Sequence, residues 1–171
     1  MRMNQEEELM AYDLVNSLSE YEIARIIRDF GQDRFHRRIA SAIVRRRAIT
    51  PLRTTQELKD LIQKSVPGGF RHQKIHPATR TFQALRIAVN SELEQMGMAL
   101  DKSVELLKKG GRIAVISFHS LEDKIAKEKF RLFAKTGSLQ ILTKKPLRPT
   151  ESEAQENSRA RSARLRGARR I

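Results

Sequence analysis

The strongest constraint on the fold of this chain is one short apolar run and the residues that follow it. Residues 113–116 read IAVI, after the glycine pair at 110 and 111. Such an uninterrupted apolar run is typical of a buried strand in a parallel sheet. A polar group follows it directly and comprises Ser117, His119 and Ser120. Ligands of open α/β sheets bind at the carboxyl ends of the strands, so we predict a candidate site here.

The last third of the chain predicts only a partial sheet. We expect a strand at 113–116, a helix at 121–134, a strand at 139–143 and a loop at 144–158. At 163–168, Ala163 and Leu165 alternate with Arg164 and Arg166, which favours an edge strand. A β-α-β unit cannot form a stable sheet alone, because parallel sheets need more strands and cover on both faces. This region therefore resembles the end of a larger α/β domain.

The first part of the chain predicts helices. Residues 4–47 carry apolar side chains at mostly helical spacing, and Ser19 with Glu22 forms a capping-box pattern. Gly31 is expected to close that helix, and Thr54 to open a further short helix. After a basic loop at 68–78, a long amphipathic helix is expected from Thr79 to about residue 108, with an interruption near Gly97.

Charge and composition narrow the class of protein. The formal net charge of +14 favours a polyanionic partner, nucleic acid first, over a merely solvated basic surface. Arginines gather at 34–47 and at 159–170, while aromatic residues make up only 5% of the chain, which favours contact with phosphates over base stacking. The chain has no cysteine, which excludes thiolate chemistry, and no apolar run of membrane-spanning length. We expect a soluble cytoplasmic protein without membrane contact.

Each candidate residue has a structural alternative. His119 is suited to acid–base chemistry, but Ser120 would cap a helix that begins at Leu121, with Asp123 completing the cap. His72 and His76 lack a third residue at ligand spacing, so no metal site is predicted. The loop around them, with Arg71 and Lys74, suits phosphate contacts better.

One face of the long helix carries a polar group that could hold RNA or could simply be solvated. It comprises Arg80, Arg86 and Asn90. Asparagine is a poor helix former, which favours a role for Asn90. Motifs for P-loop, dinucleotide-binding, zinc-protease and serine-hydrolase sites are absent from the sequence.

Five blocks in order carry a family resemblance: MRMNQEEELMAYDLVN, RFHRRIASAIVRRR, HPATRTFQALRIAVNSELE, GGRIAVISFHSLEDKIAKEKF and NSRARSARLR. Together they resemble the bacterial 16S rRNA (cytosine-N4)-methyltransferase family. The resemblance implies the C-terminal part of a Rossmann-like, S-adenosylmethionine-dependent α/β methyltransferase with an inserted all-helical domain. It implies an inserted RNA-substrate domain at 4–77 and the C-terminal part of the methyltransferase domain at 78–171. Residues 113–116 would be the fifth strand, and 139–143 with 163–168 a closing antiparallel pair.

The N-terminal half of the family, with its glycine-rich cofactor loop, has no counterpart in this sequence. The principal S-adenosylmethionine residues are therefore expected elsewhere, and none is recognised here. A gene fragment, a split gene with a complementing N-terminal chain, and a misplaced start codon all fit. The resemblance implies ribosomal RNA or the small ribosomal subunit as partner. Candidate catalytic residues are Ser117, His119 and Ser120, and candidate RNA-binding residues are Arg80, Arg86, Asn90, Arg161 and Ser162. The alternative is a non-catalytic basic RNA-binding protein or an inactive fragment.

Overall fold

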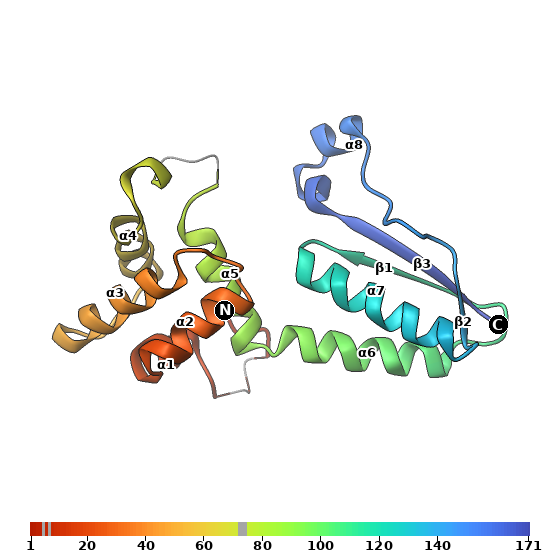
Figure 1. The fold of residues 1–171 in the computed structure, drawn as a ribbon, viewed down its shortest axis with the longest axis horizontal. Coiled ribbons are helices and arrows are strands. Elements are labelled where there is room, and N and C mark those ends of the chain that lie inside the picture. Colours follow the sequence, from red (N-terminus) through yellow and green to blue (C-terminus); the bar gives the residue numbers. More distant parts are fainter. Residues whose placement is uncertain (5, 7, 72–74) are drawn as a thin grey trace. The chain divides into compact units, whose positions relative to one another are not determined.

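The chain divides into two compact units, Met1–Glu92 and Leu93–Ile171. The structure is a computed structural model that describes residues 1–4, 6, 8–71 and 75–171. Figure 1 shows the helices and strands of the two units. His72 and Lys74 of the predicted phosphate-contacting loop lie outside the described residues. None of the helices in the described part of the chain has the length and apolar character needed to cross a bilayer.

The first unit is helical. Its elements are α1 (Ala11–Ser17), α2 (Glu20–Asp29), α3 (His36–Ile49), α4 (Thr55–Ser65), the 3-10 turn η1 (Gly68–Phe70) and α5 (Ala78–Val89). Isoleucines on successive helices fill its core and are fully buried: Ile23, Ile27, Ile39, Ile43 and Ile62. Within the predicted helical range 4–47, described residues 8–10 are not helical, and α1 begins only at Ala11.

Side-chain caps fix where two of these helices begin, as the sequence predicts. The Ser19 hydroxyl accepts the Glu22 N–H, and the Glu22 carboxylate accepts the Ser19 N–H at 2.8 Å. Thr54 and Glu57 make the same reciprocal pair at the start of α4. Each pair satisfies backbone donors that a helix start leaves without partners.

Gly31 follows α2, and its missing side chain lets two backbones approach closely. A Cβ atom at this position would lie 2.6 Å from the carbonyl oxygen of Arg80 and 2.7 Å from that of Ile27. The end of α2 is thus packed directly on the first turn of α5. Sequence reasoning identifies the glycine as a helix terminator, but this contact comes from the tertiary structure.

The predicted long helix is two helices, and the interruption predicted near Gly97 is wrong. Helix α5 ends at Val89, and α6 (Glu92–Leu106) runs through Gly97. The break lies at Asn90 and Ser91, where Ser91 has a φ of 47°, a left-handed conformation that cannot continue a helix. The apolar stripe consequently serves two cores, with Leu85 in the first unit and Leu100 in the second.

The second unit contains a three-stranded sheet in the order β1-β3-β2. Strand β1 (Arg112–Ser117) and strand β2 (Leu139–Ile141) both pair antiparallel with β3 (Arg164–Arg170). The expectation that 163–168 is an edge strand is therefore wrong, because β3 lies in the centre. The antiparallel pairing of 139–143 with 163–168 is confirmed.

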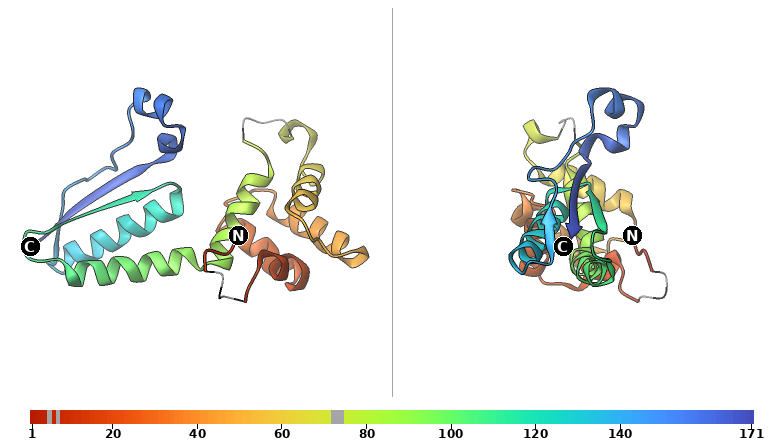
Figure 2. Two further views of the ribbon diagram at one scale, coloured as in Figure 1. Left: turned by 180° about the vertical axis from the view of Figure 1, so that it is seen from behind. Right: turned by 90° about the vertical axis from the view of Figure 1, so that its right-hand side faces the viewer.

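Helix α7 (Ser120–Lys135) packs across one face of this sheet, and α6 lies on the same side (Figure 1). Figure 2 shows this arrangement from behind. The core between them contains Val104 of α6, Phe130 of α7 and Ala168 of β3. The loop predicted at 144–158 instead holds a short helix, α8 (Glu151–Glu156), capped by Thr150 and followed by the 3-10 turn η2 (Ser158–Ser162).

The opposite face of the sheet carries exposed apolar side chains at the end of β1 that leads into α7, and Arg112 with Arg169 at its other end. Ile116 of β1 faces the same side as Leu165 and Leu147, through the cross-strand pairs that join them. Ile116 is 56% exposed and Leu147 is 59% exposed. Among the described residues, the outer edge of β1 also pairs with no other strand. The prediction of a buried strand at 113–116 is thus wrong within this chain, since one face of the strand is open.

Candidate functional site

The candidate site begins where β1 ends and α7 starts. Two residues, Phe118 and His119, join the strand to the helix. Ser117 is 1% exposed, and its hydroxyl donates to the carbonyl oxygen of Arg164 across the sheet at 3.3 Å. This hydroxyl is therefore committed to holding β1 against β3. Ser120 is the first residue of α7.

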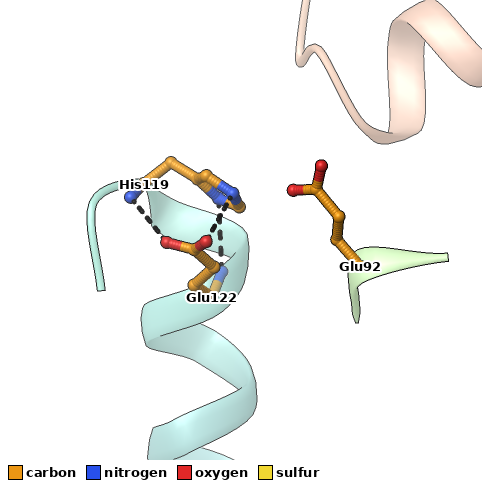
Figure 3. A group of neighbouring side chains, drawn as sticks. All are labelled: Glu92, His119 and Glu122. Atoms are coloured by element: carbon orange, nitrogen blue, oxygen red, sulfur yellow. Dashed lines mark hydrogen bonds and ion pairs between the residues drawn. The ribbon is translucent and has the colours of Figure 1, made fainter. Parts of the chain in front are cut away.

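His119, and not Ser120, is the N-cap of α7. The imidazole Nδ1 accepts the N–H of Glu122 at 3.3 Å, and the Glu122 carboxylate accepts the N–H of Phe118 at 2.8 Å and that of His119 at 3.3 Å. Figure 3 shows this reciprocal pair. The predicted cap of Ser120 with Asp123 is wrong by one residue, because the backbone turns into the helix one position earlier.

This cap restricts what the histidine can do. Because Nδ1 accepts a hydrogen bond, the neutral ring carries its proton on Nε2. That Nε2 lies 3.2 Å from Oε1 of Glu122, close enough for an ion pair but without hydrogen-bond geometry. Only 12% of the His119 side chain is exposed. In this arrangement the imidazole orients the start of α7 and is not free to accept a proton from a substrate.

The pKa of Glu122 reflects two opposing causes. Partial burial raises it, while the nearby side chain of His119 and the hydrogen bond from the backbone N–H of Phe118 lower it. The net direction is downward, so the carboxylate stays ionised at neutral pH. The turn between β1 and α7 is therefore held by a stable negative charge.

Asp123 joins α7 to β3 through interactions that the sequence analysis did not identify. Its carboxylate accepts two hydrogen bonds from the Arg166 guanidinium, at 2.6 and 3.1 Å, and one from Arg164 at 3.2 Å. Asp123 and Arg166 are 8% and 7% exposed. The alternation of Arg164 and Arg166 with Ala163 and Leu165 indicated a strand, but not what the arginines bind. No local sequence pattern predicts that both arginines bind Asp123, which lies about forty residues earlier in the chain.

The predicted RNA-facing residues of the long helix lie in different settings. Arg86 is bound to the Glu92 carboxylate by two hydrogen bonds, at 2.8 and 3.0 Å. The Asn90 side chain accepts the N–H of Met3 and donates to the carbonyl oxygen of Met1, so it ties the N-terminal segment to the end of α5. Arg80 is exposed and donates to the carbonyl oxygen of Gln32 at 3.2 Å.

The two remaining candidates lie in η2. Arg161 and Ser162 are both exposed. Their exposure keeps them available to a partner, in contrast to the paired Arg86. The structure therefore does not gather the five RNA candidates into one cluster within either unit.

Comparison with known proteins supplies the family. A family model described as the MraW methylase family matches residues 1–171. The chain belongs to this family. It is 47% identical to the "Ribosomal RNA small subunit methyltransferase H" of Sulfurihydrogenibium sp. (strain YO3AOP1) over 171 residues. It is 48% identical to the protein of the same name from Persephonella marina and 49% identical to that of Synechocystis sp..

This MraW methylase family member spans little more than half of those relatives. The matches cover 100% of this chain but 58% of the Sulfurihydrogenibium and Persephonella proteins and 54% of the Synechocystis protein. The matched region is the C-terminal part of each relative. The open edge and open face of the sheet lie in a polypeptide that corresponds to only part of its relatives.

Methyltransferase families use S-adenosylmethionine in general, and the described residues at the end of β1 do not form a pocket for it on their own. At the end of β1 the hydroxyl of Ser117 is buried and paired, and the ring of His119 is engaged by Glu122. A nucleoside cofactor needs several converging polar groups and apolar walls. This strand end offers only one side of such a site.

Proposed function

We propose that this chain is the C-terminal part of an S-adenosylmethionine-dependent enzyme that methylates N4 of a cytidine in the decoding region of small-subunit ribosomal RNA. Membership of the MraW methylase family and the name of the relatives support a methyl transfer to ribosomal RNA. The specific base, the atom and the cofactor belong to the proposal. Residues 4–77 would be the inserted RNA-substrate domain, and 78–171 the C-terminal part of a Rossmann-like methyltransferase domain.

One observation carries the proposal: the sheet of the second unit is incomplete. The part of the relatives that lies outside the match could supply what the sheet lacks. Among the described residues, β1 has an unpaired edge, and Ile116 and Leu147 are exposed on one face. Sheets of α/β proteins are covered on both faces. A polypeptide corresponding to the N-terminal part of the relatives would supply further strands beside β1 and helices over that face.

In the completed enzyme, the end of β1 would form one wall of the catalytic pocket. Transfer of a methyl group to an exocyclic amine requires alignment of the amine and removal of one proton. Ser117, His119 and Ser120 would shape this wall, with His119 acting on the backbone of the turn through its cap. The cytidine would be held by residues that both polypeptides contribute.

A reconstitution assay tests this proposal. Methyl transfer from labelled S-adenosylmethionine to small ribosomal subunits is measured with this chain alone, and with this chain plus the N-terminal part of the Sulfurihydrogenibium relative. We expect methylation only with both polypeptides, at N4 of one cytidine when the RNA is digested and its nucleosides are identified. Transfer to another base or atom would contradict the chemistry proposed.

Two matched variants test the docking face. Ile116→Lys places a charge on the apolar face beside the open edge, whereas Leu106→Lys changes a residue of α6 that is 84% exposed. We expect Ile116→Lys to abolish complementation and Leu106→Lys to preserve it, because only the first would be buried by the added polypeptide. Equal activity of both variants would show that the added polypeptide does not cover this face.

A second candidate function is a non-catalytic RNA-binding protein, and the net charge of +14 favours it. In that case the chain would bind small-subunit RNA with strong salt dependence and would show no methyl transfer with any N-terminal polypeptide. Loss of both RNA binding and activity would instead identify an inactive fragment.

A further inference from the structure

The helical unit contains a polar cavity that the methyl-transfer proposal does not use. It has a volume of about 610 Å³ and lies where α3 and α5 begin, next to η1. Its walls include Arg34, Phe35, Phe70, His76 and Arg80, together with Asp33. Two sequence blocks that are separated by some forty residues therefore meet at one cavity.

The guanidinium of Arg34 is held in place by two aromatic rings. Its central carbon lies 4.0 Å from the centroid of the Phe70 ring and 4.8 Å from that of Phe35. The two rings are themselves 5.1 Å apart and inclined at 56°. Stacking on aromatic faces restrains the guanidinium plane while its N–H groups remain at the edge. Those N–H groups match the oxygen atoms of a phosphate.

The cavity also carries a second guanidinium and an excess of positive charge. Arg80 lines it and uses one nitrogen to donate to the carbonyl oxygen of Gln32. Within the described part of the chain, neither Arg34 nor Arg80 has a carboxylate at ion-pair distance. Asp33 is the one acid in the wall, and its Oδ1 accepts the N–H of Phe35 at 2.8 Å. Two cations and one anion leave a net positive site.

The N-termini of two helices also contribute to the electrostatic potential of the cavity. Phe35 is the N-cap of α3 and Pro77 the N-cap of α5, and both residues line the cavity. Neither helix start has a side-chain cap or an acidic residue in its first turn, in contrast to α2 and α4. The Asp33 carboxylate, which accepts the N–H of Phe35, partly offsets the positive end of α3, whereas the first turn of α5 has no acidic residue and its positive end favours an anion.

His76 contributes a hydrogen-bond donor that has no acceptor within the described part of the chain. Its Nδ1 accepts the N–H of Ala78 at 3.1 Å, so the neutral ring carries its proton on Nε2. That Nε2 is buried and has no hydrogen-bond partner among the described residues. An orphaned buried donor is uncommon in folded proteins and is satisfied when an acceptor atom arrives.

We propose that this cavity binds a phosphate group of the RNA backbone, with Arg34 and Arg80 as its principal ligands. The donors, the net charge and the start of α5 all favour an anion with several oxygen acceptors. The cavity is larger than one phosphate group, which leaves space for the attached sugar. This inference rests on the proposed function for its choice of RNA over a free phosphate, and it adds a specific contact that the methyl-transfer chemistry does not require.

RNA affinity measured without cofactor tests the site separately from catalysis. The probe is a fluorescent hairpin from the decoding region of small-subunit rRNA, titrated with the full chain at several salt concentrations. We expect Arg34→Ala and Arg80→Ala each to weaken binding about tenfold and to reduce the slope of log K against log salt by about one. Arg25→Ala removes the same charge from an exposed part of α2, outside the cavity and outside both arginine zones, and should change neither quantity appreciably.

A conservative variant separates the site from net charge and from folding. Arg34→Lys keeps the charge but loses the planar fork, so we expect it to bind more weakly than the wild type with an unchanged melting temperature. If all these variants bind RNA like Arg25→Ala, the site is refuted while the methyl-transfer proposal stands. If inorganic phosphate binds in an Arg34-dependent manner and RNA does not, the cavity takes a free anion and the RNA assignment is overturned.

Discussion

The carboxylate of Asp123 binds the guanidinium of Arg166 through two hydrogen bonds, at 2.6 and 3.1 Å, and so joins the first turn of α7 to the central strand of the sheet. Both side chains are almost fully buried. Arg164, two residues earlier on β3, donates a third hydrogen bond to the same carboxylate. The turn that carries the candidate site is therefore positioned by a residue of the last strand.

Replacing Asp123 by asparagine should destabilise the second unit markedly. Asp123→Asn leaves the buried Arg166 without its counter-charge, and we expect a loss of about 3 kcal/mol in the free energy of unfolding. Urea denaturation measures this. Glu128→Gln is the control, because its ion pair with Lys124 is exposed and contributes less than about 1 kcal/mol. Equal stability of the two variants would contradict the role assigned to Asp123.

The same interaction predicts a dependence of stability on pH. The hydrogen bond from Arg166, followed by the charges of Arg166 and Arg164, lowers the pKa of Asp123 against the opposing effect of burial. A carboxylate with a lowered folded-state pKa stabilises the fold above its unfolded value, about 3.9, and this stability is lost as the pH falls through the folded-state value. Urea denaturation between about pH 6 and about pH 3 should show a steeper loss for the wild type than for Asp123→Asn. Parallel curves would refute the prediction.

Variants of His119 should separate its capping role from direct chemistry. His119→Asn retains a side-chain acceptor for the helix start, whereas His119→Ala removes it and should cost about 1 kcal/mol of stability. In the reconstituted methylation assay we expect His119→Asn to retain most activity. A His119→Asn enzyme of normal stability but without activity would show that the imidazole itself acts on the substrate.

A methyl group at Gly31 should destabilise the first unit. Gly31→Ala would bring its Cβ to 2.6 and 2.7 Å from two backbone carbonyl oxygens, which a flexible side chain cannot relieve, and we expect a loss of about 1–3 kcal/mol. Gly69→Ala is the control, since no heavy atom lies within 4 Å of the added Cβ. Thermal unfolding compares the two variants. An unchanged melting temperature for Gly31→Ala would show that α2 and α5 are less closely packed than described.

The success of the sequence analysis follows the range of the interactions involved. The cap of Ser19 with Glu22 involves residues three positions apart, and it is confirmed. Apolar periodicity likewise places α7 and β1 within a few residues of their ends. The predicted loop at 144–158 missed α8, although Thr150 followed by Glu153 is a recognisable helix start. The capping pattern is present in the sequence there, but Pro146 and Pro149 favour a loop more strongly.

Other predictions failed because the local sequence allowed two positions equally well for the same structural feature. Both His119 and Ser120 can accept a hydrogen bond at a helix start, and only the path of the backbone after β1 selects the histidine. The long helix could break at Gly97 or at Asn90, and the tertiary hydrogen bonds of Asn90 to Met1 and Met3 accompany the break there. A glycine inside a helix is merely costly, whereas Ser91 at a positive φ ends one.

The sequence by itself determined most of the helices and strands, the helical first part, the basic character and the resemblance to an rRNA methyltransferase family, because these depend on local periodicity, charge and ordered motifs. The tertiary structure decided that β3 is the central strand, that Arg166 is buried on Asp123, and that Arg34 and Arg80 line one cavity. Each of these facts joins residues more than 25 positions apart in the chain. Such pairs are chosen by the packing of whole elements, and no short stretch of sequence contains both partners.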